Sequence, residues 1–247
     1  MIYLPELSPY REKYETLEAR TVKITCNLRN NRVAGFDPIC FDNILAAAVV
    51  REAMQGRRLQ NTLTGMYDIR VPLICLYEDE RGRPLWASSA LLPQGYLIED
   101  RQYFHKRKQT GRYTGTKSGK LNLDSQRGRF MERRYIALTT VCDTLEAVAV
   151  GDPEEIARLL EQITHIGKYR SIGYGEVDTW EITMLSDTYD KTIILDDGRL
   201  IKDIPVSALE TFGWATEEEP VMTAWTPPYW TGASMGEGWR IGTEVSV

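Results

Sequence analysis

The feature that most constrains the fold is a helix whose start and buried face are both clear from the sequence. Asp152 and Pro153 are residue types favoured at the N-cap and the first helical position, and Glu155 would complete a capping box. Apolar residues then recur at helical spacing, at Ile156, Leu159, Leu160 and Ile163. Gly167 is expected to end the helix. A helix with one apolar stripe must pack against another layer of secondary structure.

The rest of the chain supplies that layer as strands. In order, the sequence predicts a strand at 21–28, a helix at 41–54, a hairpin at 71–91, strands at 133–141 and 144–150, and a strand at 176–184. Asp42 is expected to be the N-cap of the earlier helix, and Gly56 to close it. The order β-α-β-β-α-β predicts an α+β protein with a ferredoxin-like core of the RNA-recognition type, in which two helices cover one face of an antiparallel sheet.

The same pass along the chain divides it into a core and an extension. Residues 1–184 are predicted to form the ferredoxin-like core, and a basic, thumb-like insertion at 101–134 interrupts it. Residues 185–247 are less periodic and include an acidic run and a tryptophan-rich stretch. They are expected to form an irregular, β-rich C-terminal extension that packs on the core.

Charge is distributed very unevenly along the chain. The whole sequence carries −5, but residues 101–134 contain eleven lysines and arginines against two acidic residues, a net of +9. The remainder therefore carries −14. Because a local field attracts a polyanion, the insertion is a candidate nucleic-acid contact in spite of the acidic total, and its aromatic residues could stack on bases.

Other features exclude several classes of protein. The four cysteines (Cys26, Cys40, Cys75 and Cys142) are scattered without a CxxC pair, so neither a disulfide framework nor a zinc site is expected. The longest apolar run, 44–50, is too short to span a bilayer, and the first residues do not resemble a signal peptide. Acidic runs lack the spacing of a metal nuclease. We expect a cytoplasmic protein without a metal or other cofactor.

The glycine-rich stretch at 165–175 follows the capped helix and precedes a strand. A Walker loop fails because no glycine lies five positions before Gly167, and a dinucleotide motif fails because it should lie between a strand and a helix. The aromatic strand of the RNA-recognition motif matches only four of seven positions from Ile172 onward. Glycines of this kind let backbone amides approach phosphates, and the cations between them add charge.

This stretch resembles the glycine-rich loop of the RAMP superfamily of CRISPR proteins. That loop has a Gly-apolar-Gly group, five residues with basic side chains, and a second Gly-apolar-Gly group; residues 165–175 match it except that His165 replaces the first glycine. The resemblance covers about residues 20–185 and is greatest to the small type IV subunit that corresponds to the Cas5 family. In those relatives an insertion between the middle strands forms a thumb, and the basic insertion lies at that place.

The resemblance implies a non-catalytic subunit that binds the 5′ handle of the CRISPR guide RNA (crRNA). It would join the backbone subunits to a large subunit, with target DNA near the flanking motif as a further possible partner. The expected RNA contacts in the glycine-rich loop are Gly167, Lys168, Tyr169, Arg170, Ser171, Gly173, Tyr174 and Gly175. Those in the insertion are Arg101, Tyr103, His105, Lys106, Arg107, Lys108, Arg112, Tyr113, Lys117, Lys120, Arg127 and Arg129.

Three alternatives remain open from the sequence. The first is an endoribonuclease that processes guide RNA without metal, with His105 or His165 as general acid or base. The second is an unrelated RNA-binding module with the same core. The third is a backbone subunit present in many copies on each guide.

Overall fold

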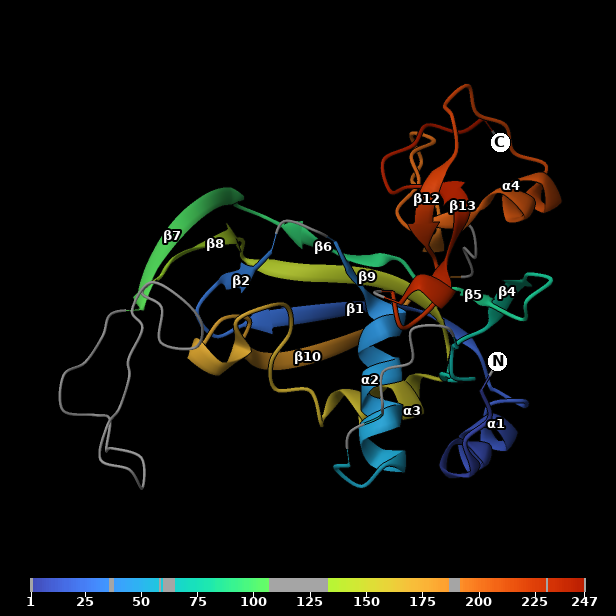
Figure 1. Cartoon of the computed structure of the whole chain (residues 1–247), viewed down its shortest axis with the longest axis horizontal. Helices are drawn as coiled ribbons and strands as arrows, with labels where there is room; N and C mark the ends of the chain where they lie inside the picture. The colour runs from blue at the N-terminus through green and yellow to red at the C-terminus, as the bar shows by residue number, and fades with distance from the viewer. Residues whose placement is uncertain are drawn as a thin grey trace, which may run out of the picture.

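The computed structural model describes residues 2–35, 38–57, 59, 65–106, 133–186, 192–229 and 231–246. Its main sheet has five strands in the order β10-β1-β9-β6-β3, and every neighbouring pair is antiparallel (Figure 1). The strands are β1 (Arg20–Leu28), β3 (Ile39–Cys40), β6 (Ala90–Gln94), β9 (Thr144–Gly151) and β10 (Val177–Met184). The predicted mixture of helices with an antiparallel sheet is therefore confirmed.

Two helices lie on the same face of this sheet, α2 (Phe41–Ala53) and α3 (Pro153–Leu160) (Figure 1). Alternating residues of β1 point toward them: Val22, Ile24 and Cys26 are completely buried in the core that the helices share. The residues between them point to the opposite, open face. Alternation in the sequence thus sets which side of the strand is covered.

Two predictions about the ends of α3 are wrong. Asp152 caps α3 as expected, because its carboxylate accepts hydrogen bonds from the backbone N–H groups of residues 154 and 155. Glu155 does not complete a capping box: its carboxylate binds side chains of other residues, and the N–H of Asp152 donates to the carbonyl of Pro72 instead. The helix also ends at Leu160, before Gly167.

Asp42 is not the N-cap of α2. The N-cap position is Cys40, which makes no side-chain capping bond, and Asp42 lies inside the first turn with its side chain fully buried. Its carboxylate accepts a hydrogen bond from the N–H of the next residue, Asn43, and pairs with Lys202 of the C-terminal extension. The local pattern of an acidic residue before an apolar run was misleading because the partner of Asp42 is distant in sequence.

A ribbon of two long strands projects from the body as an arm (Figure 1). It consists of β7 (Ile98–Lys106) and β8 (Arg133–Val141), and a third strand, β2 (Arg32–Ala34), pairs with the root of β8. Part of the segment expected to be an insertion, 101–106 and 133–134, therefore lies on regular antiparallel strands. The predicted hairpin is also present, as β4 (Cys75–Glu78) paired with β5 (Pro84–Trp86).

The C-terminal extension has its own sheet and its own core. The sheet joins β11 (Ile204–Pro205), β13 (Met235–Trp239) and β12 (Val221–Ala224), and helix α4 (Val206–Phe212) follows β11. Buried residues of this core include Leu200, Ile204, Leu209 and Trp225. The sequence analysis did not predict α4. A further short helix, α1 (Ser8–Lys13), lies near the N-terminus, beside α2.

Candidate functional site

The backbone of the glycine-rich loop requires glycine at two positions. Gly175 has a φ of 62°, and a Cβ there would lie 2.0 Å from the carbonyl oxygen of Ile166. Gly167 has a φ of 74°, and a Cβ there would lie 2.8 Å from Cγ2 of Val33. Both contacts are too close for any larger residue without a local shift, so these glycines let the loop pack tightly on the body.

Hydrogen bonds to neighbouring strands hold the two ends of the loop. The N–H of Gly175 donates to the carbonyl of Arg32 at 2.9 Å, and the N–H of Lys168 donates to the carbonyl of Ala34 at 3.2 Å. The side-chain amide of Asn30 donates to the carbonyl of Gly173 at 2.8 Å. Between these anchors, residues 168–172 are all exposed. The loop is therefore a fixed projection that carries Lys168 and Arg170 toward solvent.

Strand β7 of the arm packs directly on this loop. The ring centroid of Phe104 on β7 lies 6.1 Å from that of Tyr174 and 6.4 Å from that of Tyr169. The hydroxyl of Tyr174 also donates a hydrogen bond to the side-chain oxygen of Gln102. The predicted insertion and the predicted loop thus meet at one aromatic cluster, in which Phe104 and Tyr174 are 70 residues apart in sequence.

The two tyrosines of the loop differ in their access to a ligand. Tyr174 is one of the expected RNA contacts, but only 7% of it is exposed and its ring is enclosed by the cluster. Tyr169 is 41% exposed and adopts a left-handed φ of 56°, which is uncommon for a residue other than glycine. Tyr174 therefore supports the loop, and Tyr169 is the ring that it presents.

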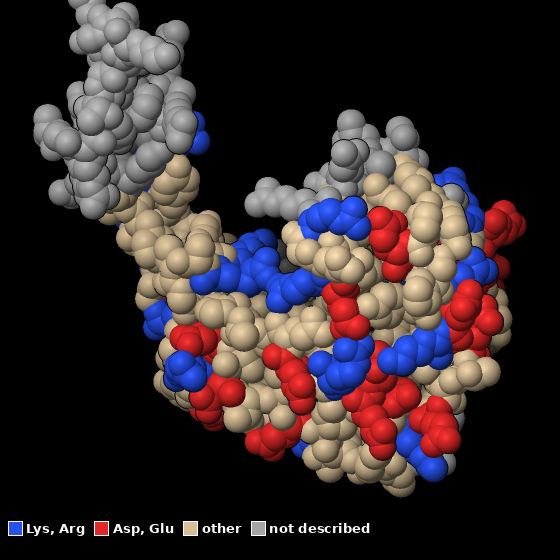
Figure 2. Space-filling model, turned by 90° about the horizontal axis from the view of Figure 1, so that it is seen from below, with Lys and Arg blue, Asp and Glu red and all other residues tan. Residues whose placement is uncertain are grey.

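Basic side chains gather where the arm leaves the body. Figure 2 shows lysine and arginine atoms clustered at the hollow beside the base of the arm, while acidic and basic residues are intermixed over the rest of that view. Arg32, at the same root, lies 3.5 Å from the carboxylate of Asp100. Basic residues are therefore concentrated locally, at the hollow beside the arm.

The predicted site residues of the insertion do not all face the glycine-rich loop. Some lie on the opposite side of the arm, and others lie outside the residues that the structure describes. Arg101, Tyr103 and His105 are on the side of the arm that faces away from the loop, because Gln102 and Phe104 alternate with them on the loop side. Lys106 ends β7, where it pairs with Arg133. Eight residues lie outside the described residues: Arg107, Lys108, Arg112, Tyr113, Lys117, Lys120, Arg127 and Arg129.

The two histidines lie on different elements. His165 pairs with Glu176 in an isolated bridge, and its Nδ1 lies 3.1 Å from the hydroxyl of Thr164. His105 is exposed on β7, opposite Arg134. Among the residues that the structure describes, no group of three or more histidine, cysteine or acidic side chains could hold a metal ion. In the same part of the chain, no helix is long and apolar enough to cross a membrane.

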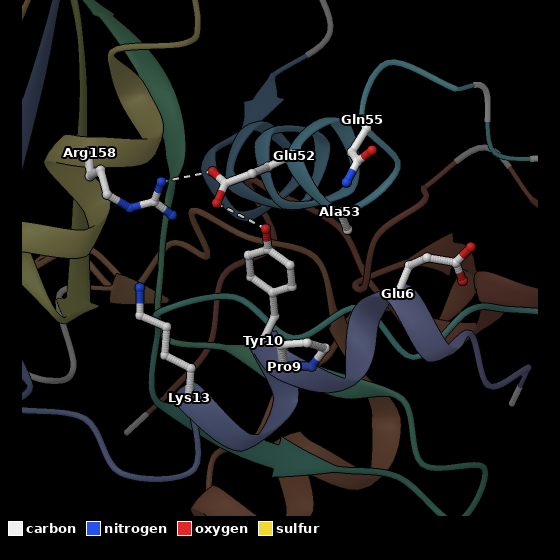
Figure 3. A pocket seen from close by; sticks show the side chains of 8 residues that line it. All are labelled: Glu6, Pro9, Tyr10, Lys13, Glu52, Ala53, Gln55 and Arg158. Atoms are coloured by element: carbon white, nitrogen blue, oxygen red, sulfur yellow. Dashed lines mark hydrogen bonds and ion pairs between the residues drawn. The ribbon is translucent and has the colours of Figure 1, made fainter.

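A second polar site, which the sequence analysis missed, lies between α1, α2 and α3 (Figure 3). It surrounds a cavity of about 400 Å³ lined by Glu6, Pro9, Tyr10, Lys13, Glu52, Ala53, Gln55 and Arg158. Arg158 bridges the carboxylates of Glu52 and Glu155, each at 2.8 Å, and Lys13 reaches Glu155 at 2.7 Å. These charges compensate one another, which favours a role in joining the helices over a role in binding a ligand.

Burial and hydrogen bonding shift the acidity of this second site. Burial alone would raise the pKa of Glu155, but hydrogen bonds from Arg158, Lys13 and Tyr14 outweigh it and lower that pKa to about 2. Burial, together with a hydrogen bond to Glu52, raises the pKa of Tyr10 to about 12. Glu155 is therefore ionised and Tyr10 neutral over the physiological range.

Comparison with known proteins adds one finding to this geometry. The model of a family described as CRISPR type IV associated protein Csf3 matches residues 20–239, which include the main sheet, the glycine-rich loop, the arm and most of the C-terminal extension. No curated protein matches the chain.

Proposed function

The chain belongs to the Csf3 family of type IV CRISPR-associated proteins, and from this premise we propose that it is a non-catalytic subunit that binds crRNA. It would cap the 5′ handle of the guide and link the backbone subunits to a large subunit of the effector, close to target DNA. Family membership supports other CRISPR proteins as partners. The RNA contact is argued from the loop and the arm.

We further propose that the core is ferredoxin-like. Four strands of the main sheet have the order β10-β1-β9-β6, in which the first and third strands of a β-α-β-β-α-β unit are central. The two helices that follow β1 and β9 lie on one face, as that plan requires. This strand order supports the assignment more directly than the element order alone.

The observation that carries the RNA proposal is the exposed segment Lys168–Tyr169–Arg170, which is held against strand β7 of the arm. Two cations flank an exposed aromatic ring, a combination that can bind phosphates on both sides of a stacked base. The anchors at Arg32 and Ala34 fix the loop before RNA arrives, so little ordering entropy is lost on binding.

The open face of the main sheet is a weaker candidate for the RNA site. Its central side chains are polar and include carboxylates: Lys23 is paired with Glu146 at 3.2 Å, and the amide of Asn27 donates to Glu181 at 2.8 Å. A sheet that binds RNA in the manner of an RNA-recognition motif presents aromatic rings at such positions. The geometry therefore favours the loop over the sheet.

The proposal is tested by replacing Lys168 and Arg170 with alanine in the full chain. We expect weaker binding of guide RNA with an intact 5′ handle, and a salt dependence reduced by about one unit for each phosphate contact that is lost. Arg199→Ala/Arg240→Ala is the matched control, since it removes the same charge from exposed residues of the C-terminal extension. Equal affinities for the loop variant and the control would refute the loop assignment.

We propose binding without cleavage, and one incubation tests this choice. Purified protein is mixed with CRISPR-repeat RNA without metal, beside His105→Ala and His165→Ala variants. Intact RNA in every sample is the expected result. Cleavage at one position that either variant abolishes would instead identify a guide-processing endoribonuclease.

A further inference from the structure

The side of the arm that faces away from the glycine-rich loop forms a continuous surface. In the register of β7 and β8, Arg101 lies opposite Leu138, Tyr103 opposite Ile136, and His105 opposite Arg134. Residues that face each other in an antiparallel pair point to the same side, and all six are exposed. On the other side of β8, Ala137 and Thr139 are completely buried. We call these six residues the outward face.

The centre of the outward face is apolar and open to solvent. Tyr103 is 47% exposed, Ile136 is 51% exposed and Leu138 is 39% exposed, and the three occupy neighbouring positions on two paired strands. Two further apolar side chains, Tyr96 and Leu97, are exposed at the turn that leads into the arm. Single exposed apolar residues are ordinary, but a contiguous group on a projecting ribbon is typical of a protein–protein contact.

The chemistry of this centre favours protein over RNA. Ile136 and Leu138 offer neither a flat ring for a base nor a hydrogen-bond donor for a phosphate. The guanidinium of Arg134 lies 3.9 Å from the ring centroid of Tyr103, so one face of that ring is already occupied by a cation. Tyr169, the exposed ring beside the two cations of the loop, lies on the other side of the arm.

Cations surround the apolar centre. Neither Arg101 nor Arg134 forms an ion pair with a carboxylate in the described part of the chain. Glu99, an acidic residue on the same side of β7 as the outward face, lies at the root of the arm, opposite Thr140. A complementary surface would have an aliphatic or aromatic centre and aspartate or glutamate at its edge.

We propose that the outward face docks another protein subunit of the effector through such an acid-rimmed apolar surface. The inference rests on the proposed function only in taking the chain to act within a complex of several subunits. The two sides of the arm would then have different roles. One side supports the loop that would bind RNA, and the outward face binds a neighbouring protein subunit.

Site-specific photo-cross-linking tests the docking surface directly. The effector is purified from cells that express all of its protein subunits with a guide RNA, and Ile136 is replaced by a photoreactive phenylalanine analogue. We expect a cross-link to a different protein subunit, at a peptide that contains aspartate or glutamate. A cross-link to RNA, a cross-link between two copies of this chain, or none at all would overturn the proposal. The same analogue at Tyr169 should cross-link to RNA.

A pair of variants separates docking from RNA binding. Ile136→Ser/Leu138→Ser should weaken association with the partner subunit at least tenfold without changing the melting temperature or the affinity for guide RNA. Val221→Ser/Met222→Ser is the matched control, because these residues are similarly exposed, at 42% and 54%, on β12. Unchanged partner binding, or a loss of RNA affinity, would refute the docking surface. If the variant of Lys168 and Arg170 binds guide RNA as tightly as the parent while the docking variant loses its partner, the RNA proposal fails and the docking proposal is supported.

Discussion

At the scale of single residues, the glycine-rich loop shows why similar glycines have different roles. Gly173 has a φ of 90° and open space around the position of a Cβ, so its conformation alone restricts the residue type. Gly175 combines a φ of 62° with the close approach of the Ile166 carbonyl. The second position is therefore restricted by packing as well as by backbone conformation.

We predict that Gly175→Ala destabilises the protein more than Gly173→Ala does. The left-handed backbone costs an alanine about 1 kcal/mol at either position, whereas the clash at Gly175 should add about 1–3 kcal/mol. Urea unfolding of the two variants and the parent measures the difference. Equal losses in the two variants would mean that the loop relaxes away from Ile166 freely.

At the scale of elements, charged side chains join the three helices below the main sheet. Glu155 of α3 accepts hydrogen bonds from Tyr14, just after α1, and from Arg158, which also contacts Glu52 of α2. Only 7% of the Glu155 side chain is exposed, so its ionisation depends on these partners. The cluster positions α1, which contributes few apolar residues to the core.

We predict that Glu155→Gln lowers the free energy of unfolding at pH 7 by about 2 kcal/mol. Because the folded pKa of Glu155 is lowered from 4.5 to about 2, its contribution is present above pH 4.5 and lost as the pH falls toward 2. The difference between the variant and the parent should therefore shrink across that interval in denaturant titrations. Glu154→Gln, which changes an exposed neighbour, is the matched control. A pH-independent difference would contradict the assignment.

At the scale of the whole molecule, the C-terminal extension is attached to the core through a buried ion pair. Nζ of Lys202 lies 2.6 Å from Oδ2 of Asp42, and the hydroxyl of Tyr229 donates to the same carboxylate at 2.7 Å. Asp42 and Lys202 are at most 1% exposed.

The C-terminal extension is acidic. Residues 192–246 contain nine acidic and three basic residues, and they lie at the opposite end of the molecule from the arm (Figure 1). The net negative charge of the extension therefore disfavours a polyanion there, which agrees with an RNA contact proposed at the arm.

We predict that Lys202→Met destabilises the chain by about 3–5 kcal/mol, because it leaves the buried carboxylate of Asp42 without its cation. Asp42→Asn/Lys202→Met should lose much less than the sum of the two single variants. Denaturant unfolding of the four proteins provides the double-mutant cycle. Additive losses would show that the two side chains are not energetically coupled.

The sequence by itself determined the elements whose signals are local. Asp152, Pro153 and the apolar stripe that follows them specify α3, because the cap and the buried face both depend on residues within about three helical turns of one another. Alternation specified β1, and composition located the basic arm, because each depends only on neighbouring residues. The resemblance in the glycine-rich loop identified the type IV family that the comparison confirmed.

Only the tertiary structure decided what each side chain meets. Asp42 has the local pattern of a cap, but its partner is 160 residues away and no spacing rule connects them. The two faces of the arm depend on the register of β7 with β8 and on the packing of Phe104 against Tyr174. Because of these contacts, Tyr103 lies on one side of the arm and Tyr169 on the other. Local propensities act over a few residues, whereas burial and charge pairing are set by contacts that exist only after the chain has folded.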